Sequence, residues 1–189
     1  MSSKFKVLEV TGVAMYACVH KAKKGFSPDD IPTWCLDLVV SDETAKLLLE
    51  EGLKPAKVKI DEDTKKNKEY AEYPGQKVFA FRRRTHKNDG TEKTPPEVVD
   101  SETNRIPPNI LIGNGSRVVV HVNPYTCNVK GKDIVCCELL GIQVLELVEY
   151  RPHGSFTPKS GFKVSSLTSD TSDHEDGDHD APSEEFHPF

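Results

Sequence analysis

The stretch that decides the fold is residues 113–150, GNGSRVVVHVNPYTCNVKGKDIVCCELLGIQVLELVEY. Its alternating pattern predicts two long β-strands joined by a turn. In the first strand Val118, Val120 and Val122 share one face, and mostly polar residues occupy the other face. Gly141 falls in the middle of the second strand, where a glycine is typical of a bulge or bend. A long, bent hairpin with one apolar face predicts a small β-barrel that displays a polar surface.

Three segments upstream of the hairpin show the same alternation and complete the barrel. The predicted strands are residues 7–24, 33–40 and 76–87. Phe79 and Phe81, two positions apart in the third of these, are expected in the core. Five strands with long connections predict an all-β fold, an OB-fold barrel, which is a fold that commonly binds oligonucleotides.

One short helix is predicted between the second and third strands, over residues 41–51. Ser41 or Asp42 supplies an N-cap, an acidic residue favours the first turn, and a glycine follows the last turn. We expect Ala45, Leu48 and Leu49 to pack against the barrel. The helix is interpreted as structural.

Two long loops are predicted beside the barrel strands. Residues 53–75 are rich in lysine and acidic residues, so we expect an exposed excursion whose basic tract can either face solvent or touch nucleic acid. Residues 88–108 contain two proline pairs, which argue against a regular strand ladder. Long loops of this kind often line a binding groove.

Length and composition predict one domain and a tail. The chain has 189 residues, of which 36% are hydrophobic. The sequence shows no signal peptide and no apolar run long enough for a bilayer, which predicts a soluble intracellular protein. We expect a domain over residues 1–150. Residues 151–189 are too polar to offset their ordering entropy, so we predict a disordered acidic tail.

Charge also divides the chain, at residue 165 within the predicted tail. Residues 165–189 contain eight acidic residues and no lysine or arginine, which leaves 22 acidic and all 25 basic residues upstream. The tail ends in Phe186-His187-Pro188-Phe189. Aromatic residues at the end of an acidic tail predict a docking peptide, with Phe186, Pro188 and Phe189 contacting a partner; the alternative is an end with no role.

The five cysteines are Cys18, Cys35, Cys127, Cys136 and Cys137. Their number is odd and their spacing fits no C-x-x-C pair, so we expect buried, reduced thiols. Adjacent strand residues point to opposite sheet faces, which argues against a zinc site. We therefore predict no metal.

Catalytic motifs are missing from the sequence. It contains no phosphate-binding G-x-x-x-x-G-K-[ST] loop, no G-x-S-x-G elbow and no H-E-x-x-H metal motif. We predict a protein that is not an enzyme and needs no cofactor.

Several blocks, taken in order, resemble the OB-fold single-stranded DNA-binding proteins of tailed bacteriophages. The blocks are residues 16–21 (YACVHK), 34–38 (WCLDL), 79–81 (FAF) and 112–117 (IGNGSR), followed by Pro124-Tyr125, the leucine-rich last strand and the tail. The Pro-Phe ending is also similar to that of bacterial single-strand binders.

The resemblance implies a protein of phage DNA replication, recombination and repair in the cytoplasm of an infected bacterial cell. It would coat single strands and recruit a polymerase, a helicase–primase or a nuclease through its tail, without membrane contact. A homodimer is compatible with the sequence. The resemblance implies that Tyr125 occupies the position of a base-stacking tyrosine of the family. Two residues later, Cys127 stands where the family pattern has a tryptophan.

Single-strand binding needs cations for phosphates and flat rings for bases. We predict that the ssDNA-binding residues are Tyr16, Lys21, Trp34, Arg82, Arg84, Arg117, His121, Tyr125 and Lys130. Of these, Tyr125, Trp34 and Tyr16 would stack on bases and the lysines and arginines would meet phosphates. Trp34 can alternatively lie in the core, and any single lysine can simply face solvent.

Two other function classes fit the same pattern. One is an OB-type protein-interaction module, which would explain the tail but not the run of three arginines. The other is an RNA-binding or strand-annealing factor that uses the same groove.

Overall fold

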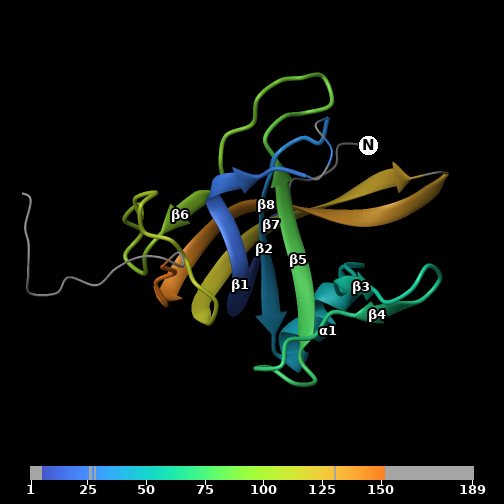
Figure 1. Ribbon diagram of the computed structural model, residues 1–189, viewed down its shortest axis with the longest axis horizontal. Coiled ribbons are helices and arrows are strands. Elements are labelled where there is room, and N and C mark those ends of the chain that lie inside the picture. Colours follow the sequence, from blue (N-terminus) through green and yellow to red (C-terminus); the bar gives the residue numbers. More distant parts are fainter. Residues whose placement is uncertain (1–5, 26, 28, 130, 152–189) are drawn as a thin grey trace, which may run out of the picture. The chain divides into compact units, whose positions relative to one another are not determined.

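Five strands close into a barrel in the computed structural model, which describes residues 6–25, 27, 29–129 and 131–151 (Figure 1). The strands are β1 (Leu8–Lys23), β2 (Thr33–Val40), β5 (Lys77–Arg84), β7 (Ser116–Val129) and β8 (Lys132–Glu146). They follow the order β5-β2-β1-β7-β8, and a parallel pairing of Arg82 with Glu138 joins β5 to β8. A closed five-stranded barrel with one short helix is an OB-fold, so the predicted fold class is confirmed.

The inward faces of these strands form the core as the alternation predicts. Val118, Val120 and Val122 on β7 are fully buried, and Phe79 and Phe81 on β5 are 2% and 1% exposed. Burying a side chain of this size contributes roughly 1.5–3 kcal/mol. Truncating either phenylalanine to alanine would therefore cost roughly 3–5 kcal/mol, because a cavity remains.

A bulge on β8 lies where the sequence places Gly141. His121 pairs with Gly141 and Val122 pairs with Leu139, so Leu140 is an extra residue on β8. A Cβ added to Gly141 would come within 3.2 Å of the carbonyl oxygen of Glu97. The absence of a side chain at Gly141 therefore allows a neighbouring strand to approach closely, and the glycine also lies at the bend of the barrel.

That neighbour is β6 (Glu97–Val99), which corrects the prediction of an irregular loop over residues 88–108. It pairs in parallel with β8, and Val98 is 6% exposed. The strand lies between the two proline pairs, so its amide groups remain free to join the ladder. The prolines on both sides limit the length of β6 but do not prevent the strand from forming.

The helix α1 (Asp42–Glu50) begins after Ser41, whose side chain accepts a hydrogen bond from the amide of Thr44. Ala45 and Leu48 are buried as predicted, but Leu49 is 43% exposed and does not belong to the packed face. No helix among the described residues is long and apolar enough to cross a membrane.

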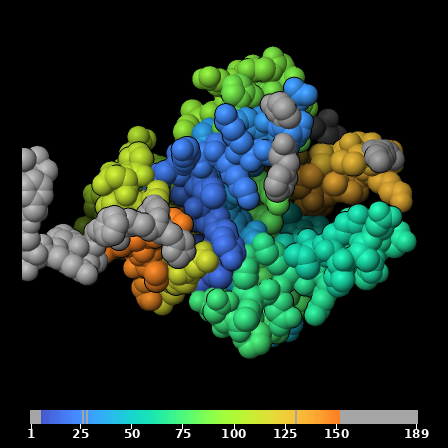
Figure 2. All heavy atoms as spheres, in the orientation of Figure 1, coloured from blue at the N-terminus to red at the C-terminus, as the bar shows by residue number. Residues whose placement is uncertain are grey.

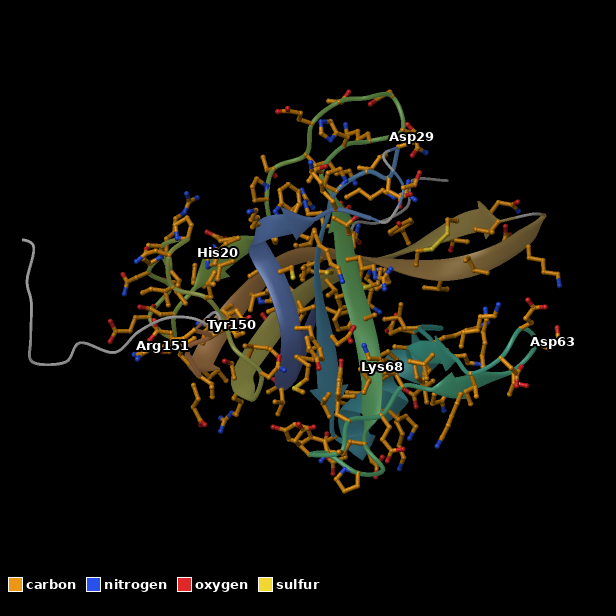
Figure 3. The ribbon with its side chains drawn as sticks, in the orientation of Figure 1. His20, Asp29, Asp63, Lys68, Tyr150 and Arg151 are labelled. Atoms are coloured by element: carbon orange, nitrogen blue, oxygen red, sulfur yellow. A yellow bond between two sulfur atoms is a disulfide. The ribbon has the colours of Figure 1, made fainter. Side chains whose placement is uncertain are left out.

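The charged segment 53–75, called the excursion below, folds into an arm. It contains the short antiparallel strands β3 (Lys57–Lys59) and β4 (Lys65–Asn67), all of whose residues are exposed. Asp63 marks the tip of this arm in Figure 3. Tyr70, only 9% exposed, packs with Met15, Val39 and Val78 and fixes the base of the arm to the barrel.

The prediction of buried, reduced cysteines is wrong for Cys127 and Cys136, which are oxidised, and the three free thiols are only partly buried. Cys127 and Cys136 form a disulfide across the β7–β8 hairpin, with Cα atoms 6.5 Å apart (Figure 3). Diagonal positions on paired strands come close enough for this bond, which the expectation of a reducing compartment did not allow for. The remaining three, Cys18, Cys35 and Cys137, are free and half-buried.

Candidate nucleic-acid interface

A groove of about 890 Å³ crosses the outer surface of β1, β2 and β5. We call it the central groove, and its lining includes Tyr16, Lys23, Asp37, Lys68, Arg82 and Tyr150. In Figure 2 the blue surface of β1 lies open at the centre of this face, with the teal excursion on its right. Lys68 and Tyr150 lie on opposite sides of β1 in Figure 3, so the groove runs across that strand.

Two further hollows continue the central groove. One, of about 670 Å³, lies by the loop after β1, and the other, of about 780 Å³, lies between β5 and the β7–β8 hairpin. Arg82 lines all three, and Arg84 lines the second and third. The three hollows therefore form one extended groove, with Tyr16 in the central groove and Tyr125 in the hollow beside the hairpin.

The charge of this extended groove is positive. Its lysines and arginines are Lys23, Lys24, Lys68, Arg82, Arg83, Arg84, Lys87 and Lys93, and its carboxylates are Asp29, Asp30, Asp37 and Glu138. The excess of cations suits a polyanion that follows the groove.

Strand alternation gives the three arginines of β5 different roles. Arg83 donates to Glu138 at 3.1 Å and to the carbonyl oxygen of Thr94 at 2.7 Å, and Lys93 donates to the same carboxylate at 2.7 Å. Arg82 and Arg84 are exposed on the groove side. Arg82 makes no ion pair within the described residues, so its guanidinium is available to a ligand.

Tyr16 and Tyr125 are the exposed aromatic side chains expected at the interface. Tyr16 is 61% exposed and lines the central groove, whereas Tyr125 is 44% exposed and lines the hollow beside the hairpin. Tyr125 pairs in register with Cys136, and its ring thus lies next to the disulfide. Exposed rings along a cationic groove are what base stacking requires.

Trp34 is not available for stacking. Its side chain is 7% exposed, because it lies on the same face of β2 as the buried Leu36, Leu38 and Val40. Of the two alternatives that the sequence left open for this tryptophan, the structure supports the core.

Three other predicted residues lie away from the extended groove. Arg117 forms an ion pair with Glu146 at 2.9 Å, and His121 lies 3.3 Å from Glu9. Lys21 is exposed on β1, but Lys23, two residues later, lines the groove in its place. Arg117 and His121 are on β7 and Lys21 is on β1, and none of the three lines the extended groove.

The remaining predicted residues lie outside the described part of the chain. They are Lys130 in the hairpin turn and Phe186, Pro188 and Phe189 in the tail, together with the eight acidic tail residues.

A cluster in the central groove was not predicted from the sequence. Asp37 Oδ2 accepts hydrogen bonds from Lys68 Nζ and, at 2.5 Å, from Tyr70 Oη. Burial, together with Asp37, raises the pKa of Tyr70 to about 12. Burial alone would lower the pKa of Lys68, but its hydrogen bonds to Asp37 and Tyr70 outweigh that effect and raise it. The sequence feature that could have indicated this anchor is Tyr70, an aromatic residue within a very polar segment.

Tyr150 is a second groove residue that was not predicted from the sequence. It is 49% exposed, lines the central groove and donates its amide hydrogen to the carbonyl oxygen of Leu111 at 2.9 Å. The hydrogen bond fixes the backbone of the last strand-like segment at the groove edge. A third exposed ring thus belongs to the groove.

Comparison with known proteins agrees with this geometry at the level of fold. No protein-family model matches the chain, and no curated protein matches it significantly. Among solved structures, gp2.5, a single-stranded DNA-binding protein encoded by bacteriophage T7, is similar with a TM-score of 0.53 and 18% identity, over 85% of this chain and 100% of that one.

The single-stranded DNA-binding protein from bacteriophage Enc34 is similar in two further structures. One has a TM-score of 0.50 and 18% identity, over 79% of this chain and 87% of that one. The other, a C-terminal truncation, has a TM-score of 0.50 and 19% identity, over 74% of this chain and 86% of that one. The structural neighbours of this chain are thus phage single-stranded DNA-binding proteins, as the sequence resemblance predicts, and the fold is the one they share.

Proposed function

We propose that this chain binds single-stranded DNA without sequence preference, through the extended groove. The observation that carries the proposal is the cationic groove in which Tyr16 and Tyr125 are exposed, on a barrel similar to those of phage single-strand binders. Cations meet the sugar–phosphate backbone, and each ring accepts any base because every base has a π-face.

A titration with three labelled oligonucleotides tests this proposal. Single-stranded DNA, single-stranded RNA and duplex DNA of equal length are compared at one salt concentration. We expect single-stranded DNA to bind more tightly than the duplex, since a duplex hides its base faces. Preference for RNA would favour an RNA-binding or annealing factor, and absence of binding to all three would favour a protein-interaction module.

We further propose that the acidic tail competes with DNA for the groove. The tail begins at Arg151, next in sequence to Tyr150, which lines the central groove. Eight acidic residues tethered at this point would reach a high effective concentration near the cations. Deleting residues 165–189 should tighten DNA binding at low salt and change it little at high salt. Equal affinity at low salt with and without the tail would contradict competition.

The tail also supplies the proposed partner contact. Phe186, Pro188 and Phe189 would bind a replication protein such as a polymerase, helicase–primase or nuclease in the cytoplasm of the infected cell. Removing Phe189 alone should leave DNA affinity unchanged while binding to the partner is lost. Loss of DNA affinity in that variant would argue against separate roles.

A further inference from the structure

Tyr16 has an unusual backbone conformation. Its φ is 50°, and Thr103 is the one other non-glycine residue with positive φ among those described. Tyr16 lies at an irregularity in the pairing of β1 with β2, between Met15 and Cys18. A bulky residue rarely adopts this conformation, and such strain is retained mainly where function requires it.

The surrounding structure holds Tyr16 in this conformation. Its amide donates to Asn114 Oδ1 at 2.7 Å, which fixes the backbone from the side of the loop before β7. Its ring centroid lies 5.8 Å from that of Tyr70, with the planes inclined by 38°. Lys68 Nζ lies 5.8 Å from the Tyr16 centroid and 5.2 Å from the Tyr70 centroid. The ring of Tyr16 is thus supported on one side, although the residue is 61% exposed.

Asp37 ties this support to the barrel. It pairs in register with Met15, so it lies beside the irregularity that carries Tyr16. One of its carboxylate oxygens accepts from both Lys68 and Tyr70. Because the charge of Lys68 is balanced by Asp37 at direct contact, Lys68 has less charge to offer a phosphate than an unpaired cation such as Arg82.

We propose that Asp37, Lys68 and Tyr70 are positioning residues that hold the Tyr16 ring as a platform for one nucleobase. The excursion thereby acquires a role, because it brings Lys68 to the groove and Tyr70 to the ring of Tyr16. The inference rests on the proposed function and adds which ring takes a base and what orients it. It also gives Lys68 the role of orienting the Tyr16 ring, although a lysine in this groove would otherwise be expected to bind phosphate.

The variant Tyr16→Gly separates a platform from a structural residue. Glycine adopts positive φ freely, and this relief offsets the lost ring contacts with Tyr70 and Lys68, so the variant should melt within a few degrees of the wild type. We expect its affinity for single-stranded DNA to fall by roughly 5- to 150-fold, the range for one lost stacking contact. Tyr16→Phe keeps the ring and should restore most of the affinity. Leu47→Ala, an exposed truncation on α1, serves as the control and should bind like the wild type.

An abasic oligonucleotide shows whether the lost contact is to a base. On a strand of equal length and charge without bases, Tyr16→Gly and the wild type should bind within about twofold of one another, since there is nothing to stack. The same large loss on the abasic strand would overturn the proposal. If the wild type binds neither strand, the proposed function fails as well; if it binds and Tyr16→Gly binds equally, only the platform fails.

Double variants test the positioning residues. Asp37→Asn and Tyr70→Phe should each weaken binding, and neither should weaken it further once Tyr16 is glycine, because positioning matters only while the ring is present. Lys68→Gln should leave the slope of log affinity against log salt unchanged, whereas Lys23→Gln should make it shallower by about 0.7. Losses that add to that of Tyr16→Gly, or a slope change for Lys68→Gln equal to that for Lys23→Gln, would contradict the proposal.

Discussion

Adjacent arginines on β5 differ in what they contact, and the difference gives a test at the scale of single residues. Arg82 is exposed in the groove, whereas Arg83 is held by Glu138 and Thr94. Arg82→Gln should make the salt slope of DNA binding shallower by about 0.7 and leave stability unchanged. Arg83→Gln should instead lower stability by about 1–3 kcal/mol, because its hydrogen bonds to a charged group are lost.

Urea denaturation and titration of both variants at several salt concentrations distinguish these outcomes. The two substitutions remove the same charge from neighbouring positions, so each serves as the control for the other. Equal effects on the salt slope would show that strand alternation does not separate their roles.

Residues whose environment depends on strand alternation could be predicted from the sequence. Arg82 and Arg84 were expected in the groove and Phe79 in the core because period-two patterning sets which face each side chain takes. Trp34 could not be decided, since a residue at a strand start can face either way. Lys68 was missed because its position depends on how the excursion folds back on the barrel, which no local pattern contains.

At the scale of elements, the β7–β8 hairpin combines a predicted strand pair with an unexpected crosslink. The end of the hairpin projects to the right of β5 in Figure 1. The Cys127–Cys136 disulfide closes a short loop and, by chain entropy, should stabilise the fold by roughly 2–3 kcal/mol. Adding a reductant should therefore lower the free energy of unfolding and speed amide exchange near Tyr125.

Two variants check that the reductant acts on this bond. The double variant Cys127→Ser/Cys136→Ser should resemble the reduced protein and should not respond to reductant. Cys137→Ser, at a free thiol beside the bond, should respond as the wild type does. A wild type whose urea unfolding curve is the same with and without reductant would contradict the stabilising role.

The excursion gives a prediction about alkaline pH. The pKa of Tyr70 is raised from its ordinary value of 10.0 to about 12, chiefly by burial and then by Asp37. The folded protein therefore holds this proton more tightly than the unfolded chain does. The stabilisation is complete below about pH 10 and is lost as the pH rises towards 12.

Tyrosine absorbance measured during alkaline titration reports this group directly. The wild type should show one step near pH 12 that Tyr70→Phe lacks, and the difference in unfolding free energy between the two proteins should shrink over about pH 10–12. Tyr73→Phe, in the same segment, is the matched control and should keep the late step. A late step that persists in Tyr70→Phe would assign the shifted pKa to another tyrosine.

At the scale of the whole molecule, barrel closure brings distant segments to one surface. The extended groove takes Tyr16 from β1, Arg82 from β5 and Tyr125 from β7. The five barrel strands and their order along the chain could be predicted from the sequence, because each has its own pattern, whereas the short strands β3, β4 and β6 could not. The side of the closed barrel on which Arg117 and His121 lie could not, because it depends on the twist and register of the complete sheet.

The salt dependence of single-stranded DNA affinity tests the central claim most directly. Five cations of the extended groove form no ion pair within the described residues: Lys23, Lys24, Arg82, Arg84 and Lys87. If each meets one phosphate, log affinity should fall against log salt with a slope of about −3.5, at roughly −0.7 per phosphate. A slope of about −3.5 for the tail-deleted chain supports the cationic groove as the binding site. A flat salt response would contradict it.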